Sequence, residues 1–148
     1  MSELPHILIV EDSEDDYEAT IRSFEKNHVA NPVTRCSNGQ NAIDFLKKTG
    51  AYEGRPDIKR PDLILLDLNM PGMDGRQALE VMKQDERLKK IPVVVLTTSN
   101  DINDVEKCYE SGASTYIQKP VEFDGLVKVV GTIKEYWLGI AILPMSGD

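Results

Sequence analysis

Three carboxyl residues stand directly after apolar runs, which is an unusual position for charged side chains. Glu11 and Asp12 follow HILIV, and Asp67 follows LILL. Runs this apolar are typical of strands buried on both faces, and a carboxylate at the end of such a strand is costly to bury unless its charge is compensated. Brought together, the three acids would repel one another, so a cation is expected among them.

The chemistry that such acids could support is phosphoryl transfer assisted by a divalent cation. Mg²⁺ prefers carboxylate and phosphate oxygens, and these positions hold no His or Cys, which disfavours zinc. Asp67 is the candidate nucleophile, because carboxylates can form aspartyl-phosphates. Lys119 would hold a phosphoryl oxygen as a point charge, and the hydroxyl of Thr97 could donate to another. The predicted metal ligands are Glu11, Asp12, Asp67 and the backbone carbonyl of Asn69.

Apolar runs alternate with amphipathic stretches, and this order predicts the elements that position the site. The expected strands span 6–10, 32–36, 63–66, 91–96 and 113–117, and the expected helices span about 13–27, 39–50, 74–82, 101–111 and 122–138. Strands that alternate with helices imply a doubly wound α/β fold, with a parallel sheet and helices on both faces. The site of such a sheet lies at the carboxyl ends of the strands, where the acids, the hydroxyls and Lys119 all stand.

The segment GAYEGRPDIKRP, at 50–61, is rich in Gly, Pro and charge and predicts a surface loop. It is longer than most connections in compact domains. Both a plain solvated insertion and a functional loop fit this composition.

Length and charge limit the class of protein. A chain of 148 residues fits one domain, and a net charge of −8 argues against binding of nucleic acid through the chain as a whole. No apolar stretch approaches the roughly 20 residues that cross a bilayer. The N-terminus lacks the basic region of a signal peptide, so the cytoplasm is the expected location. Cys36 and Cys108 match no metal or redox spacing and are expected to be free thiols.

Four short motifs stand in a fixed order along the chain. They are the acid pair in VEDS, the acceptor in LILLDLNMPGMDG, the hydroxyl in VVVLTTS and the lysine in YIQKP. From about His6 to Leu138 the chain resembles response-regulator receiver domains, the CheY-like superfamily. The resemblance implies a flavodoxin-like (βα)5 fold, with five parallel strands in the order 2-1-3-4-5. It also implies a single receiver domain over 1–148, which here ends in an apolar tail at 139–148.

The resemblance assigns a role to each site residue. Asp67 would accept a phosphoryl group from a phosphohistidine of a sensor histidine kinase or a histidine phosphotransfer protein, with Mg²⁺ bound beside it. Thr97 would move towards the phosphoryl group, Tyr116 would turn inward behind it, and Lys119 would bond it. The bond between Lys119 and Pro120 is expected to be cis. A stand-alone regulator of this kind has no separate enzymatic output domain and acts by switching its partner binding or its dimerisation.

Three longer stretches resemble a narrower set, the single-domain regulators paired with bacterial phytochrome histidine kinases. The stretches are GAYEGRPDIKRPDLILLDLN, LKKIPVVVLTTS and IKEYWLGIAILP. This resemblance implies a phytochrome-type kinase as the partner.

The C-terminal part of the chain carries more apolar residues than one buried helix face requires. A stripe with helical spacing predicts core packing and consists of Leu126, Val130, Ile133 and Trp137. The excess consists of Tyr136, Leu138, Ile140, Ile142 and Leu143. An apolar excess at a chain end is typical of a partner surface, and homodimerisation through the fourth and fifth helices and the tail is the favoured hypothesis. A tail folded back on its own domain is the alternative.

Other interpretations of the site residues remain open at this point. Glu11 and Asp12 could only favour the N-terminus of the following helix, Ser99 or Thr97 could cap a helix, and Tyr116 could be a core residue. A second functional class is a hydrolase with an aspartyl nucleophile, like the haloacid-dehalogenase-like phosphatases. That class needs a second acid two residues after the nucleophile, where this chain has Asn69. An inactive receiver that serves as a scaffold is the third possibility.

Overall fold

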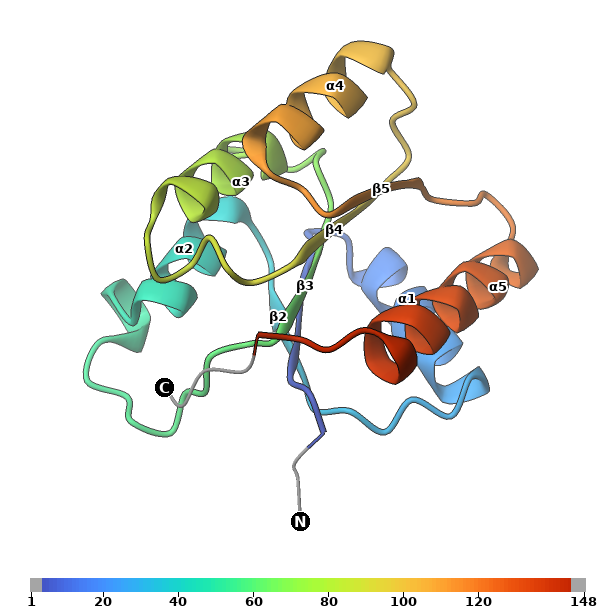
Figure 1. The fold of residues 1–148 in the computed structure, drawn as a ribbon, viewed down its shortest axis with the longest axis horizontal. Coiled ribbons are helices and arrows are strands. Elements are labelled where there is room, and N and C mark those ends of the chain that lie inside the picture. Colours follow the sequence, from blue (N-terminus) through green and yellow to red (C-terminus); the bar gives the residue numbers. More distant parts are fainter. Residues whose placement is uncertain (1–3, 145–148) are drawn as a thin grey trace.

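The computed structural model describes residues 4–144 and contains one sheet of five parallel strands in the order β2-β1-β3-β4-β5. The strands are β1 (Ile7–Val10), β2 (Val33–Cys36), β3 (Leu63–Leu66), β4 (Val93–Thr97) and β5 (Thr115–Gln118). The sheet twists through the middle of the molecule (Figure 1). The predicted doubly wound fold and strand order are confirmed.

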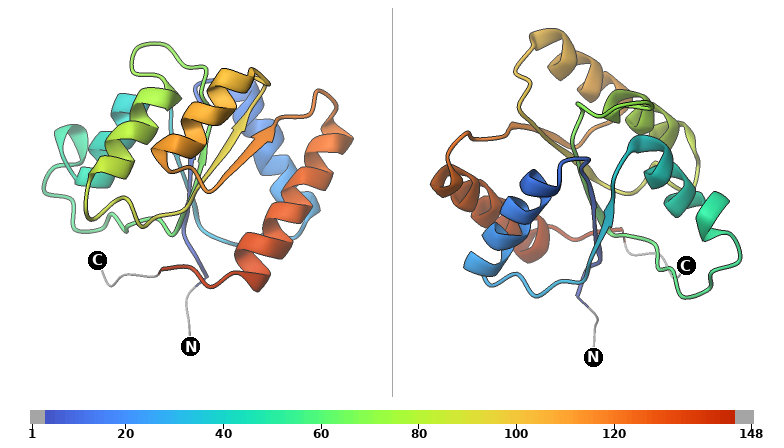
Figure 2. Two further views of the ribbon diagram at one scale, coloured as in Figure 1. Left: turned by 45° about the horizontal axis from the view of Figure 1, so that its top comes forward. Right: turned by 180° about the vertical axis from the view of Figure 1, so that it is seen from behind.

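Helices cover both faces of the sheet. They are α1 (Glu14–Lys26), α2 (Gly39–Lys47), α3 (Gly75–Gln84), α4 (Ile102–Ser111) and α5 (Phe123–Ile133). Figure 2 shows α1 and α5 on one face and the other three on the opposite face. The core is therefore divided in two by the sheet.

The central strands are apolar throughout because both of their faces are covered. Along β1, Leu8 and Val10 pack under α2 and α3, while Ile7 and Ile9 pack under α1 and α5. Every residue of β1, β3 and β4 is buried. Successive side chains of a strand point to opposite faces, so a strand between two helical layers needs no polar positions until it ends.

Side-chain caps fix where the helices begin. Ser13 caps α1, as predicted, by accepting a hydrogen bond from the amide of Asp16 at 3.2 Å. Asp74 caps α3 in a reciprocal capping box with Gln77. The cap of α4 is Asp101, which excludes the alternative that Ser99 or Thr97 caps this helix.

The segment 50–61 is partly packed. It begins with the short helix η1 (Gly50–Tyr52), and the ring of Tyr52 meets Phe45 edge to face at a centroid distance of 5.3 Å. Ile58 is buried, while the residues between these two anchors are exposed. This loop is therefore a cover over one edge of the core rather than a plain solvated insertion.

The last helix changes its geometry before it ends. After α5 the chain continues as η2 (Lys134–Ile140), a π-helix, where the sequence predicts an uninterrupted α-helix to about Leu138. The predicted core stripe is confirmed, since Leu126, Val130 and Ile133 are buried and Trp137 packs beside them. No helix within residues 4–144 is long and apolar enough to cross a membrane.

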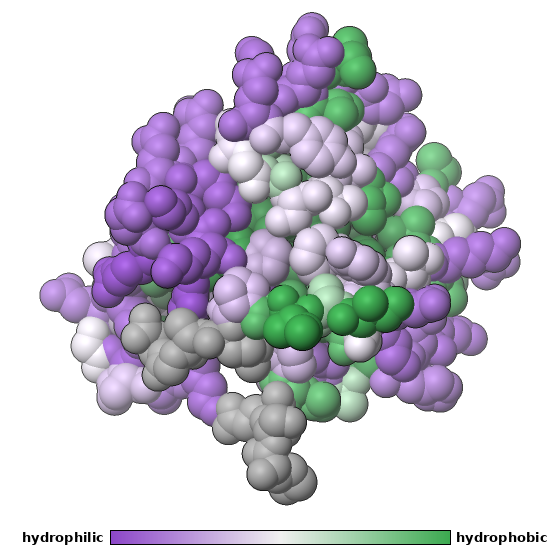
Figure 3. Space-filling view, viewed as in Figure 1, coloured by the Kyte–Doolittle hydropathy of each residue, from purple (hydrophilic) through white to green (hydrophobic). Residues whose placement is uncertain are grey.

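The tail at 139–148 is described as far as residue 144, and the rest of it lies outside the described residues. Leu143 is buried against its own domain, whereas Ile140 and Ile142 are 68% and 98% exposed. Figure 3 shows apolar residues on the surface near this C-terminal segment. The tail thus combines an intramolecular anchor with an exposed apolar surface.

Candidate functional site

Strand pairing brings the acids to one point at the edge of the sheet. Val10 of β1 pairs with Leu66 of β3, and the amide of Asp67 donates to the carbonyl of Val10 at 3.1 Å. Glu11 and Asp67 are therefore neighbours, and Asp12 follows at once. One carboxylate oxygen from each of the three acids lies within 4.8 Å of the others.

This set of donors fits a hard divalent cation. Octahedral Mg²⁺ has oxygens about 2.1 Å away, so ligands on opposite sides of such an ion stand about 4.2 Å apart, close to the spread of this cluster. Glu11 and Asp67 are buried and Asp12 is exposed, which leaves one side open to water and to a phosphoryl group. All of the side-chain donors are oxygens, which suit a hard cation better than they suit zinc.

Arg35 on β2 holds the turn that carries the two N-terminal acids. Its guanidinium donates to the backbone carbonyl of Glu11 at 3.1 Å and to that of Asp12 at 3.2 Å. It also pairs with Glu14 at 3.0 Å and lies over the ring of Tyr17. Because these bonds go to backbone oxygens, the carboxylates remain available to a metal. No motif in the sequence pointed to Arg35.

Lys119 forms a buried ion pair with Glu11. Its amide donates to the carbonyl of Thr97 at 2.6 Å, and its ammonium group reaches the Glu11 carboxylate at 2.8 Å. Both side chains are less than a tenth exposed. Asp16 on α1 lies 3.6 Å from the same ammonium group and was also missed from the sequence. The ammonium group of Lys119 thus offsets the negative charges of Glu11 and Asp16, which would otherwise repel each other.

Burial and pairing act in opposite directions on this ion pair. Desolvation raises the pKa of Glu11 to about 7, although the hydrogen bond and charge of Lys119 lower it. Desolvation is also the largest single influence on Lys119 and favours the neutral amine, but the hydrogen bond and charge of Glu11, helped by the charge of Asp67, outweigh it and raise the pKa. A divalent cation would favour ionised Glu11, because ligands must be deprotonated to bind a metal.

Thr97 ends β4 beside the acids and is fully buried. Its hydroxyl oxygen accepts from the side-chain amide of Asn69 at 3.4 Å and from the amide of Ser99 at 3.5 Å. Both contacts are long, which makes them weak hydrogen bonds. The hydroxyl of Thr97 is therefore held only by weak hydrogen bonds, although the residue itself is fixed in the strand.

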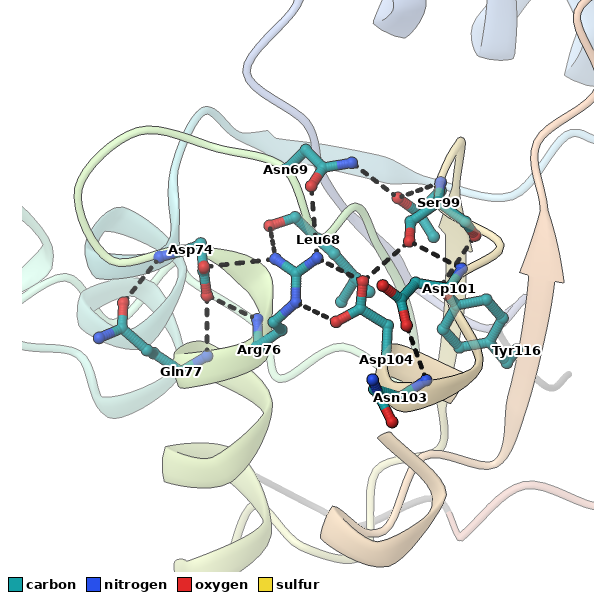
Figure 4. Close-up of polar contacts among 11 residues, drawn as sticks. Leu68, Asn69, Asp74, Arg76, Gln77, Ser99, Asp101, Asn103, Asp104 and Tyr116 are labelled. Carbon is teal, nitrogen blue, oxygen red and sulfur yellow. Dashed lines mark hydrogen bonds and ion pairs between the residues drawn. The ribbon is translucent and has the colours of Figure 1, made fainter. Parts of the chain in front are cut away.

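Tyr116 on β5 points over the loop between β4 and α4. Its hydroxyl donates to the backbone carbonyl of Ser99 at 2.9 Å, and its backbone amide donates to the hydroxyl of Tyr109 at 3.0 Å. The side chain lies partly buried beside the core under α3 and α4. Figure 4 shows this ring next to Ser99 and Asp101. The ring thus lies over this loop in the structure, and its turning inward on phosphorylation stays a prediction.

One expectation for this region is wrong. The chain contains no cis peptide bond within the described residues, so the bond between Lys119 and Pro120 is trans. The ammonium group of Lys119 nevertheless reaches Glu11, because the strand-like bond from its amide to Thr97 already directs the side chain into the site.

A second charged pair stands beside the acids and has no counterpart in the sequence analysis. Arg76 on α3 and Asp104 on α4 form two parallel bonds, each 2.6 Å long (Figure 4). The two residues lie on different helices, and their pairing depends on how those helices face each other. Hydrophobic periodicity places each helix on the sheet but does not give that orientation, so the sequence offered no signal for this pair.

The comparisons with known proteins agree with this geometry. The family model of the response regulator receiver domain matches residues 7–131. Response regulator Rcp1 of Synechocystis sp. is 41% identical over 140 residues, which cover 95% of this chain and 93% of Rcp1. The structure of the phosphorylated cyanobacterial phytochrome response regulator RcpA is 37% identical, with a TM-score of 0.88 over 96% of this chain and 99% of RcpA.

The Mn²⁺-bound form of Rcp1 is a further similar structure, with 39% identity and a TM-score of 0.87 over 95% of this chain and 99% of that one. A receiver similar to this chain therefore takes up a divalent metal. The matches cover these relatives almost completely, which leaves no room in them for a separate enzymatic output domain. From its motifs, its fold and these matches, this chain belongs to the family of response-regulator receiver domains, which act as phosphoryl acceptors in two-component signalling.

Proposed function

We propose that Asp67 is the phosphoryl acceptor of this receiver and that Glu11, Asp12, Asp67 and the backbone carbonyl of Asn69 hold Mg²⁺. The observation that carries the proposal is the cluster of three carboxylates with Lys119 at the carboxyl ends of neighbouring strands. Bound Mg²⁺ would neutralise charge on the transferring phosphoryl group. The proposed domain is the single receiver of residues 1–148, with the apolar tail at 139–148.

The phosphoryl donor is a phosphohistidine of a sensor histidine kinase or of a histidine phosphotransfer protein. A carboxylate oxygen of Asp67 attacks phosphorus and forms the O–P bond of an acyl phosphate. The P–N bond of the donor breaks, and the imidazole nitrogen leaves with the bonding electrons and takes a proton from solvent. Lys119 exchanges part of its contact with Glu11 for a phosphoryl oxygen, which its charge stabilises.

Thr97 and Tyr116 convert the modification into a change of shape. The hydroxyl of Thr97 moves from its two weak contacts to a phosphoryl oxygen, which is a stronger, charge-assisted acceptor. Tyr116 follows because its hydroxyl is bonded to the loop that Thr97 begins. The surface formed by α4, β5 and α5 then differs between the two states.

The partner is a phytochrome-type histidine kinase, and the active form is a homodimer. The kinase type is supported by the similarity to RcpA, a phytochrome response regulator, across nearly the whole of both chains. The dimer is supported by the exposed apolar side chains at Tyr136, Ile140 and Ile142. We place the protein in the cytoplasm, where such kinases present their phosphohistidines.

The structure offers nothing in favour of a hydrolase. Asn69 stands two residues after the acceptor, and an amide cannot serve as general acid or base. The described chain also carries no cap domain over the acids, since its elements all belong to one sheet and its two helical layers.

Beryllofluoride, which mimics the acyl phosphate, tests the proposal directly. Wild type should bind it only when Mg²⁺ is present, and Asp67→Asn should not bind it. The exposed residue Asp57 gives a matched control, because Asp57→Asn removes a carboxylate far from the site. Equal binding by wild type and Asp67→Asn would contradict the assignment of the acceptor.

A further inference from the structure

Arg76 and Asp104 join two helices beside the phosphorylation site, and we name this ion pair the α3–α4 clamp. In the two 2.6 Å bonds, Nε and Nη2 of Arg76 each donate to a different carboxylate oxygen of Asp104. Such bidentate, charge-assisted bonds are the strongest class of side-chain hydrogen bond and also fix geometry. The side chains are 34% and 17% exposed, so solvent screens the clamp only in part.

The clamp continues into the loop between β4 and α4. Asp104 accepts a second bond, of 2.8 Å, from the hydroxyl of Ser99. The backbone carbonyl of the same Ser99 accepts the hydroxyl of Tyr116 at 2.9 Å. A short chain of strong hydrogen bonds therefore runs from α3 through the loop to the side chain of Tyr116 (Figure 4).

A weaker branch reaches the acceptor from the other side. Arg76 lies 3.4 Å from the side-chain oxygen of Asn69 and 3.5 Å from the carbonyl of Leu68. Asn69 in turn approaches the hydroxyl of Thr97 at 3.4 Å. Because all of these contacts are long, they contribute less than the branch through Ser99.

We propose that Arg76 is a positioning residue that acts through Asp104. By fixing Asp104, it holds Ser99 where the Ser99 carbonyl accepts the hydrogen bond of the Tyr116 hydroxyl. This arrangement favours the phosphoryl-bound form of the site. The inference rests on the proposed function, because it assigns the clamp a role in that same reaction. Neither Arg76 nor Asp104 touches the three acids in the structure.

The physical argument is one of preorganisation. A loop that already presents the Ser99 carbonyl to Tyr116 loses less conformational freedom when the phosphoryl group arrives. Without the clamp the loop samples other positions. The apparent affinity for the phosphoryl group or its mimic then falls in proportion to the population of the loop position that can bind it. Couplings between sites in proteins correspond to about a fivefold change in affinity or more.

The test compares beryllofluoride affinity at saturating Mg²⁺ in four variants. Arg76→Gln and Asp104→Asn each remove one side of the clamp, and both should weaken binding roughly fivefold. A charge swap, Arg76→Asp with Asp104→Arg, should recover most of the loss. Arg55→Gln is the matched control, since it breaks another arginine–aspartate pair, with Asp57, far from the site.

A double-mutant cycle separates positioning from a general loss of stability. Tyr116→Phe removes the hydroxyl that donates a hydrogen bond to the backbone carbonyl of Ser99. If the clamp acts through that bond, Arg76→Gln should weaken binding much less in the Tyr116→Phe background than in wild type. Equal effects in both backgrounds would overturn the proposed route.

The outcomes also separate the clamp from the proposed function. Wild type that binds no beryllofluoride would overturn the function and the clamp together. Wild type that binds it, with Arg76→Gln binding it equally well, would overturn the clamp alone. Circular dichroism of each variant confirms that its fold is intact, and if Arg76→Gln fails to fold then Asp104→Asn carries the comparison.

Discussion

A buried strand can end in a carboxylate at Asp67 because the ammonium group of Lys119 lies close enough to interact with its charge. Lys119 is already present in the structure, held by Glu11, and a divalent metal would supply the remaining charge. Burying the Lys119–Glu11 ion pair costs desolvation free energy, and buried ion pairs add little net stability. The value of this pair lies in keeping an ammonium group dry and close to the acceptor until a phosphoryl group arrives.

Replacing the charge of Lys119 should separate metal binding from phosphoryl binding. Lys119→Met should keep or increase Mg²⁺ affinity, because a competing cation is removed, and should greatly weaken beryllofluoride binding. It should also lower the free energy of unfolding by about 1–3 kcal/mol, since Glu11 loses its buried partner. Titration calorimetry and urea unfolding measure these effects, with Lys128→Met on the exposed side of α5 as the control. Undiminished beryllofluoride binding would contradict the role of Lys119.

Acid should weaken the contribution of Asp104 to stability. Its pKa is lowered to about 2, chiefly by the hydrogen bond from Arg76, with smaller help from Ser99 and Lys107. Because the folded-state pKa lies below the ordinary value of 3.8 for an aspartate, the charged form stabilises the fold above about pH 4, and this stabilisation is lost as the pH falls towards 2.

Urea unfolding of wild type and Asp104→Asn over this pH range checks the sign. The difference in free energy of unfolding should be constant near neutral pH and should shrink between about pH 4 and pH 2. If the difference in free energy of unfolding between wild type and Asp104→Asn stayed unchanged down to pH 2, the stabilising role of the Arg76–Asp104 ion pair would be contradicted.

The clustering of the candidate site residues was largely predictable from sequence, whereas the residues that support them were not. Glu11, Asp67 and Lys119 stand at strand ends, and parallel pairing brings such ends together whatever the details of the helices. Arg35 and Arg76 act through contacts across elements, which depend on side-chain length and helix orientation. No local pattern records those contacts.

At the scale of elements, the close approach of α3 to the end of β3 determines where Asp67 lies. Gly75 is the first residue of α3, and its amide donates to the carbonyl of Leu68 at 3.0 Å. A β-carbon at this position would overlap the carbonyl oxygen of Asp67 and stand 2.7 Å from the α-carbon of Leu68. The atoms in the way are backbone, which cannot yield as a flexible side chain does.

Gly75→Ala should therefore displace the acceptor. We expect the variant to fold with reduced stability and to lose most of its beryllofluoride binding, because small displacements of reacting groups are costly. Gly139→Ala is the matched control, since a β-carbon there meets only an ordinary contact at 3.6 Å. If Gly75→Ala bound beryllofluoride as well as the control does, the proposed dependence on this helix would be wrong.

The elements also show where local patterns stop being informative. Existence and order of the strands and helices follow from apolar runs and caps, and these were predicted correctly. The π-helical turn of η2 was not, because its apolar spacing also fits an α-helix. The predicted start of α4 at Asp101 agrees with its cap, and the alternative that Ser99 caps this helix is excluded, since the Ser99 hydroxyl donates to Asp104.

At the scale of the whole molecule, the exposed apolar surface of the tail predicts self-association. The double variant Ile140→Ser, Ile142→Ser should raise the dissociation constant of the phosphorylated dimer more than tenfold, since each buried isoleucine contributes about 1.5–3 kcal/mol. Val121 is 99% exposed and lies outside the tail, so Val121→Ser, checked to bind beryllofluoride as wild type does, gives a control of similar chemistry. Light scattering with beryllofluoride and Mg²⁺ measures the change, and a mass unaffected by the double variant would exclude this surface.

The most direct test of the central claim is to locate the phosphoryl group. Wild type and Asp67→Asn are incubated with Mg²⁺ and isotopically labelled acetyl phosphate, and the labile phosphate is mapped to a residue by reductive trapping and mass spectrometry. The site described here predicts label on Asp67 alone, dependent on Mg²⁺ and absent from Asp67→Asn. Full labelling of that variant, or label on another residue of the wild type, would contradict the assignment.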